Sequence, residues 1–177
     1  KRQITWQRSS SKSSWEAYPT GQNEVLRLTQ SQVGYSYRAV VSYIDSHGTR
    51  EVLYTSPSET IDNLDDPVQG EVTIIGEPKE GVTLRALSNS LSDEDGIASI
   101  SISWETSKDG RNWIGVNSLS GPVLSLGQSL VGSQVRARVA VVDNFGIETN
   151  LYSQATRTVE NVNNKPSGRI VIRRVGQ

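Results

Sequence analysis

Carboxylate side chains are the residues of this 177-residue chain whose number and spacing could support chemistry. Residues 60–110 hold 11 Asp and Glu but only 3 Lys and Arg, a local balance of −8, although the whole chain has a net charge of −1. Within this region Asp93 and Asp95 lie two residues apart, and Gly96 follows them and lets the backbone turn. Hard cations such as Ca²⁺ bind oxygen ligands of this kind, so the region is compatible with a cation site. A solvated acidic surface is the other interpretation.

The sequence offers few candidate residues for other kinds of chemistry. The chain has no cysteine, which excludes thiolate nucleophiles, disulfides and zinc–thiolate sites. A Ser/His/Asp grouping would have to use the single histidine, His47, which lies in a predicted turn. Asp93 and Asp95 share one loop and so do not flank a substrate cleft, as the two carboxylates of a glycosidase do. We therefore expect that the protein is not an enzyme.

Nucleic acids and membranes are also unfavourable partners. The basic residues are dispersed, apart from Arg169, Arg173 and Arg174, and the net charge is slightly negative. No apolar run approaches the roughly 20 residues that cross a bilayer, so we expect no membrane insertion. No segment has the pattern of a signal peptide. Because the sequence lacks methionine altogether, we expect it to be an internal piece of a longer protein.

An internal repeat of 98 residues organises the chain. Residues 4–74 and 102–172 align without gaps and share 22 identities in 71 positions, among them both Trp pairs, Trp6 with Trp104 and Trp15 with Trp113. This register predicts three parts: residues 1–64 as an incomplete repeat that lacks its opening strands, 65–162 as a complete repeat, and 163–177 as the first strand of a following repeat. The period is the length of a domain, so each repeat is expected to bury its own core.

The local sequence pattern predicts an all-β fold. Residues 134–142 alternate, so that Arg136 and Arg138 lie on one face of a strand and the valines lie on the other. The segments 45–48, 143–146 and 108–111 each contain Asp and Gly and predict hairpin turns. No segment shows helical periodicity. Short strands separated by polar turns are typical of an immunoglobulin-like β-sandwich, with Trp6 and Trp104 expected in the cores.

Several short motifs resemble one family in particular. They are Gly70-x-Val72-x-Ile74-x-Gly76, Glu80-Gly81-x-x-Leu84, Leu91-Ser92-Asp93-Glu94-Asp95-Gly96, Ile102-Ser103-Trp104 and Val139-x-Val141-x-Asp143-x-x-Gly146. Together they resemble the tandem cadherin-like or immunoglobulin-like repeats of giant bacterial adhesins of the RTX type, which are exported by type I secretion. The resemblance implies an extracellular, non-catalytic extender module on a bacterial cell surface, in contact with neighbouring repeats of the same chain.

The resemblance also implies calcium at the junction between repeats. In the cadherin-like arrangement a Glu-Gly turn, an Asp-x-Asp-Gly turn and an Asp-rich linker converge there. Carried over by motif, the ligand candidates are Asp62, Asp65, Glu80, Asp93 and Asp95. The second linker, residues 160–166, departs from this pattern because it has one carboxylate and one lysine, so calcium is expected to bind weakly or not at all there.

Two alternative functions remain open from the sequence. The chain could bind a cell-surface glycan or protein, with Trp15 or Tyr18 stacking on sugar rings, and the tyrosines at 35, 37 and 43 have no aromatic counterpart in the second repeat. It could instead be a subunit of a surface layer or filament, in which the segment 168–173 completes a sheet in another copy by strand addition.

Overall fold

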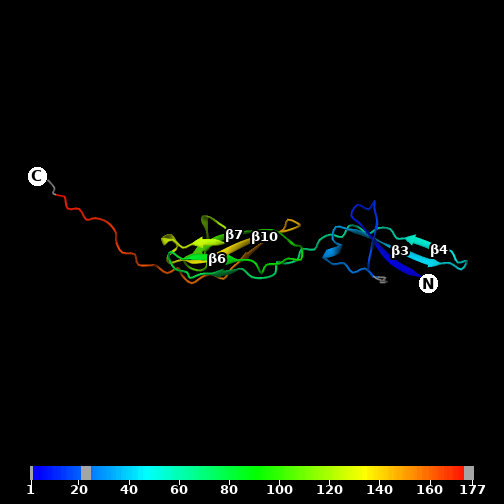
Figure 1. Cartoon of the computed structure of the whole chain (residues 1–177), viewed down its shortest axis with the longest axis horizontal. Coiled ribbons are helices and arrows are strands. Elements are labelled where there is room, and N and C mark those ends of the chain that lie inside the picture. The colour runs from blue at the N-terminus through cyan, green and yellow to red at the C-terminus, as the bar shows by residue number, and fades with distance from the viewer. Residues whose placement is uncertain (1, 21–24, 174–177) are drawn as a thin grey trace. The chain divides into compact units, whose positions relative to one another are not determined.

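The chain folds into antiparallel β-sheets in two compact units, Lys1–Asp66 and Pro67–Gln177. Figure 1 shows the strands of each unit in the computed structural model, which describes residues 2–20 and 25–173 without the side chains of 117–119. Among these residues the only helical segments are two short 3-10 turns, Gln30–Gln32 and Gln128–Leu130. No helix in the described part of the chain is long and apolar enough to span a membrane. The all-β prediction is confirmed.

The first unit is one four-stranded sheet in the order β2-β1-β3-β4. Its strands are β1 (Gln3–Ser9), β2 (Glu16–Tyr18), β3 (Ser36–Ile44) and β4 (Arg50–Tyr54). The turn between β3 and β4 is closed by Asp45, whose Oδ1 accepts hydrogen bonds from the N–H groups of His47 and Thr49, each at 2.8 Å. This turn is the hairpin that the sequence predicts.

The second unit has two facing sheets. One has the order β11-β10-β7-β8 and the other the order β5-β6-β9. Their strands are β5 (Thr73–Ile75), β6 (Thr83–Leu87), β7 (Ile97–Ser107), β8 (Ile114–Ser120), β9 (Val123–Ser125), β10 (Gln134–Asp143) and β11 (Glu148–Tyr152). Seven strands divided in this way, with a buried Trp on the third, define an immunoglobulin-like β-sandwich.

The core of the second unit lies between these sheets. Strand β10 alternates strictly between buried and half-buried positions, which places Val135, Val139 and Val141 in the core, as its sequence predicts. Trp104 on β7 is fully buried among them, and its indole N–H donates a hydrogen bond of 3.0 Å to the carbonyl of Gly121. The aromatic ring thus fills the sandwich while its one polar atom is satisfied.

The first unit departs from the expectation that each repeat buries its own core. Tyr37 and Ala39 are its only buried hydrophobic residues among those described. The equivalent of Trp104, Trp6, is only partly buried, and Leu53 on the same face is exposed. The physical reason is that no opposite sheet covers this face in the part of the unit that the structure describes. Residues 25–27, the repeat counterpart of β9, form no strand, and no second sheet of described residues belongs to this unit.

Residues 163–173 form no strand and have no β-sheet partner among the described residues. Ile170 and Ile172 are each 94% exposed, whereas their repeat equivalents Val72 and Ile74 pack into the core of the second unit. The last four residues, 174–177, lie outside the described residues. The predicted following repeat and the strand-addition hypothesis therefore stay predictions.

Candidate metal centre

The turn that precedes β7 directs one carboxylate inward. Asp93 Oδ1 accepts a hydrogen bond of 2.8 Å from the backbone N–H of Asp95, and the Asp93 carbonyl accepts one of 3.1 Å from the N–H of Gly96. Gly96 has φ +78°, and a Cβ atom there would lie 2.1 Å from the side-chain nitrogen of Asn144. The turn therefore packs closely against the β10–β11 turn, and the Asp95 side chain is only 3% exposed.

The β10–β11 turn supplies a second carboxylate, Asp143, which is 4% exposed. Its Oδ1 accepts hydrogen bonds from the N–H groups of Phe145 and Ile147, each at 2.8 Å, and so closes the turn as Asp45 does in the first unit. Its Oδ2 is buried and accepts no hydrogen bond from any described residue. Burying a carboxylate oxygen without a hydrogen bond destabilises the folded state unless a positive charge lies beside it.

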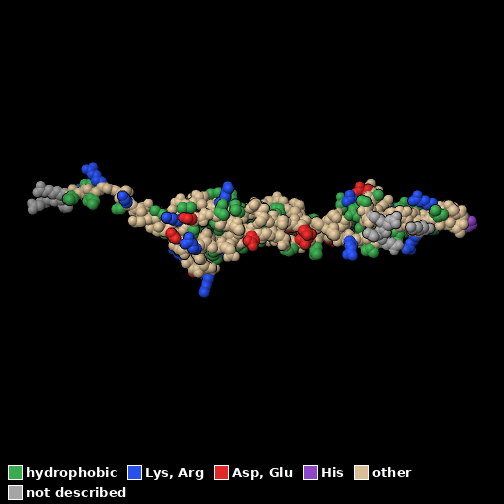
Figure 2. All heavy atoms as spheres, turned by 60° about the horizontal axis from the view of Figure 1, so that its bottom comes forward, with side chains coloured by type: hydrophobic (Ala, Val, Ile, Leu, Met, Phe, Trp, Pro, Cys, Tyr) green, Lys and Arg blue, Asp and Glu red, His purple; other side chains and the backbone are tan. Residues whose placement is uncertain are grey.

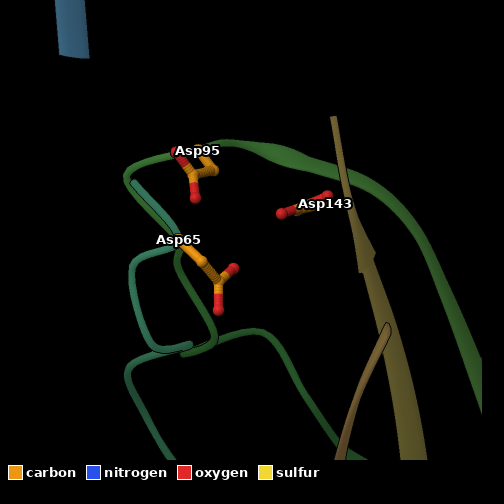
Figure 3. Close-up of side chains that lie close together, drawn as sticks. All are labelled: Asp65, Asp95 and Asp143. Carbon is orange, nitrogen blue, oxygen red and sulfur yellow. The ribbon is translucent and has the colours of Figure 1, made fainter. Parts of the chain in front are cut away.

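Sheet pairing brings these carboxylates together. Asp143, the last residue of β10, pairs with Ile97, the first residue of β7, at a register shift. Asp95 lies two residues before Ile97, and Asp65 lies two residues before Pro67, the first residue of the second unit. Asp65, Asp95 and Asp143 each offer one carboxylate oxygen, and these oxygens lie within 4.8 Å of one another. Figure 3 shows the Asp143 carboxylate pointing toward the other two.

The donor set of this cluster fits a hard cation. Three carboxylates at this spacing repel one another, and two of them are buried. Ca²⁺ binds oxygen ligands at about 2.3–2.6 Å, so two oxygens on one ion lie at most about 5 Å apart. The observed spacing meets this limit, and the Oδ2 atom of Asp143 is an oxygen that a cation would satisfy.

The structure brings together only two of the five residues predicted as calcium ligands, Asp65 and Asp95. Asp93 uses its Oδ1 atom to hold the turn, and Asp62 is exposed and lies outside the described cluster. Glu80 lies at the opposite end of the second unit, where its Oε2 accepts a hydrogen bond of 2.9 Å from the N–H of Val162.

The sequence analysis missed Asp143 as a candidate ligand. Its Asp-x-x-Gly motif recurs at Asp45, and this recurrence indicated a turn residue only. No sequence signal pairs Asp143 with Asp95, because their proximity comes from the register of β7 and β10.

The two predicted ligand-binding aromatic residues lie on opposite faces of the first sheet. Trp15 stacks with Arg38, whose guanidinium carbon is 4.4 Å from the ring centroid, on the outer face. Tyr18 is on the inner face, where it makes an edge-to-face contact with Tyr37 and a hydrogen bond with Gln32. The structure therefore does not join Trp15 and Tyr18 into one site.

His47 does not take part in a catalytic group in the described part of the chain. It lies exposed in the β3–β4 turn, its ring contacts only the hydroxyl of Ser46, at 3.4 Å, and no described carboxylate pairs with the ring. The Ser/His/Asp arrangement that would need this residue is therefore not assembled.

Comparison with known proteins adds little to this description. No protein-family model matches the chain, and no curated protein matches it significantly. Among solved structures, a crystal structure of consecutive titin domains is similar over 90% of this chain, with 15% identity and a TM-score of 0.36. The chain covers 55% of that titin chain. A likeness of this strength establishes neither family nor function, so the assignment to an immunoglobulin-like fold depends on the strand order and register.

Proposed function

We propose that the chain is a non-catalytic extender module of a large, repeat-built bacterial surface adhesin, located outside the cell. Residues 1–64 and the equivalent part of the second repeat form the same antiparallel arrangement, in which β1, β3 and β4 of the first unit correspond to β7, β10 and β11 of the second. Repetition of one module along a chain serves to span distance. The family resemblance of the motifs supplies the adhesin part of the proposal.

We further propose that Ca²⁺ binds at Asp65, Asp95 and Asp143. The observation that carries this proposal is the Oδ2 atom of Asp143, buried and without a described hydrogen-bond donor, in a cluster of three carboxylates. A bound ion would neutralise the three carboxylates of the cluster. The family resemblance adds the role of such an ion, which would stiffen the extender.

The test is a thermal melt of the chain in EGTA and in 10 mM Ca²⁺. Extracellular calcium modules bind with Kd of about 10⁻⁴–10⁻³ M, so 10 mM Ca²⁺ stabilises the folded state by about 1.4–2.7 kcal/mol. For a domain of this size the expected rise in Tm is about 5–10 °C. The variant Asp143→Asn keeps an Oδ1 acceptor for the turn but removes the charge, and it should lose most of this rise.

The repeat supplies a matched control, Asp45→Asn. Asp45 accepts the same two turn hydrogen bonds as Asp143 and belongs to no described carboxylate cluster. This variant should keep the full calcium response. An unchanged Tm in 10 mM Ca²⁺, or an equal response in Asp143→Asn, would refute the calcium site and leave the extender role to stand on the repeat alone.

A further inference from the structure

The outer face of the first sheet carries an aromatic–arginine stack that also occurs in the second repeat. Arg38 lies between Trp15 and Tyr54, with its guanidinium carbon 4.4 Å from each ring centroid. In the second unit Arg136 lies between Trp113 and Tyr152 at 4.3 Å from each centroid. The stack is therefore a shared feature of the fold, and the residues around it show how the two faces differ.

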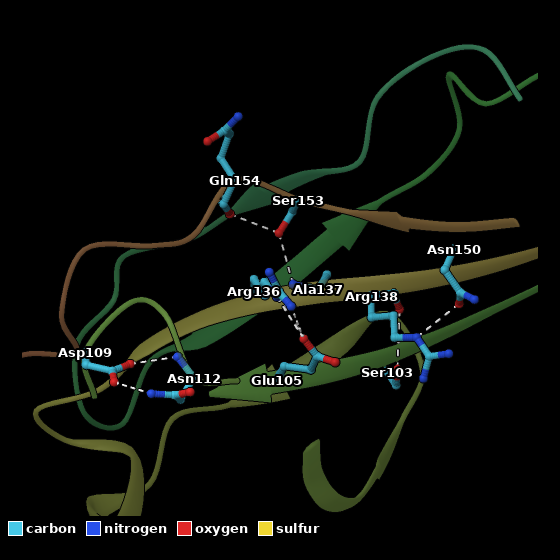
Figure 4. Close-up of polar contacts among 10 residues, drawn as sticks. All are labelled: Ser103, Glu105, Asp109, Asn112, Arg136, Ala137, Arg138, Asn150, Ser153 and Gln154. Atoms are coloured by element: carbon cyan, nitrogen blue, oxygen red, sulfur yellow. Dashed lines mark hydrogen bonds and ion pairs between the residues drawn. The ribbon is translucent and has the colours of Figure 1, made fainter. Parts of the chain in front are cut away.

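In the second unit the charge of this face is neutralised. Arg136 forms an ion pair of 2.7 Å with Glu105 and Arg138 donates a hydrogen bond of 3.0 Å to Asn150, as Figure 4 shows. Glu148 supplies a second negative charge on the same face, opposite Val142 in the strand register. Two arginines and two glutamates give a balance of zero.

In the first unit each of these polar partners is replaced. Gln7 occupies the position equivalent to Glu105 and accepts one hydrogen bond of 2.9 Å from Arg38 Nε. Arg50 occupies the position equivalent to Glu148. No described carboxylate forms an ion pair with Arg38 or Arg50. The balance of the face is therefore +2 among the residues that the structure describes, from two arginines and no acidic residue.

Two further replacements make this face more apolar. Val40 and Val52 occupy the positions of the hydrogen-bonded pair Arg138 and Asn150 of the second unit. Strand pairing aligns Val40 with Tyr54 and Ile44 with Arg50, so these side chains share the face with Arg38. Tyr54 is 56% and Ile44 is 63% exposed. On the side that Figure 2 shows, hydrophobic and basic side chains lie over the part of the chain that contains β3 and β4, with few acidic ones.

We propose that the outer face of β1, β3 and β4 in the first unit is a docking surface for a protein segment that presents carboxylates beside apolar or aromatic side chains. Arginine without an ion-pair partner attracts carboxylates, and arginine beside an exposed Tyr and a half-buried Trp is the composition enriched at protein interfaces. Exposed Val and Ile side chains favour a polypeptide over a sugar, because aliphatic side chains offer no stacking surface to a sugar ring. This surface is separate from the calcium cluster and does not depend on the proposed function.

The probe is a random copolymer of glutamate and tyrosine, titrated into the full chain at low salt in EGTA, with polyglutamate and polygalacturonate as comparisons. We expect the copolymer to bind more tightly than polyglutamate. The double variant Gln7→Glu/Arg50→Glu installs the residues of the second repeat, so it suits the fold, and it should weaken copolymer binding at least tenfold. Val52→Asn should weaken binding of the copolymer but not of polyglutamate.

A charge change in the second unit is the matched control. Arg138→Glu makes the equivalent face of that unit more acidic without touching the first unit, and the binding of the full chain to the copolymer should stay unchanged. No copolymer binding, or binding that the Gln7→Glu/Arg50→Glu variant leaves intact, would overturn the proposal. Polygalacturonate binding as tightly as the copolymer, and lost in the same variant, would overturn the protein assignment in favour of an acidic polysaccharide.

Discussion

The hydroxyl of Ser153 tests how the β-sandwich provides a hydrogen-bond acceptor for a buried backbone N–H group of strand β10. Strand β11 ends at Tyr152, and beyond it the side chain of Ser153 takes over as an acceptor: its Oγ lies 2.9 Å from the buried backbone nitrogen of Ala137. The same Oγ donates a hydrogen bond of 2.9 Å to the carbonyl of Gln154 (Figure 4). Ser153→Ala removes the acceptor and leaves the Ala137 N–H buried without a partner.

The expected cost follows from that unpaired donor. A buried N–H group without an acceptor costs about 1–3 kcal/mol, so the free energy of unfolding of the second unit should fall by this amount in Ser153→Ala. The corresponding fall in Tm is about 4–12 °C. Urea denaturation measures the free energy, and hydrogen exchange of the Ala137 amide locates the effect in the second unit.

The first repeat indicates the rescuing substitution. Thr55 occupies the equivalent position, and its Oγ1 accepts a hydrogen bond of 3.0 Å from the N–H of Ala39. Ser153→Thr should therefore stay within about 0.5 kcal/mol of the parent protein. The reasoning is wrong if Ser153→Ala costs less than about 0.5 kcal/mol, or if Ser153→Thr is as destabilising as Ser153→Ala.

Two further predictions concern the turns. Lys12 has φ +60° where the second repeat has Gly110 at +70°, so Lys12→Gly should stabilise the first unit by about 0.5–1 kcal/mol in urea denaturation, and a loss of stability would contradict this. Hydrogen bonds from the backbone N–H groups of Asn112 and Arg111, then from side chains, hold the pKa of Asp109 well below its usual range. A carboxyl whose pKa is lowered by folding stabilises the protein above its unfolded pKa of about 4 and loses this effect as the pH falls. Asp109→Asn should therefore flatten the loss of stability between pH 5 and pH 2, and an unchanged pH profile would count against it.

The alternation of side chains within short segments and the positions of turn residues determined the strands and hairpins of this fold. Strand β10 could be predicted without tertiary information, because its valines and arginines separate with a period of two into a buried and a half-buried face. Trp104 was predicted in the core for the same reason, and the Asp-x-x-Gly motifs at 45 and 143 specified hairpins. These features are local, since each depends on backbone geometry within a few residues.

The candidate metal centre was decided by pairing between distant strands. Asp143 joins Asp95 because β10 pairs with β7, and no spacing along the chain encodes that register. Glu80 was predicted as a ligand by its motif, but the order of the strands places it at the other end of the unit, beside Val162.

The sequence by itself thus determined the repeat, the strands, the turns and the acidic composition, because side-chain alternation and glycine placement act over short distances. Only the tertiary structure decided which carboxylates meet, and among the described residues it buries Trp104 of the second repeat more completely than its equivalent Trp6. The reason is that burial needs an opposing surface. An apolar pattern specifies which face of a strand points inward, whereas a core forms only where a second sheet packs against it.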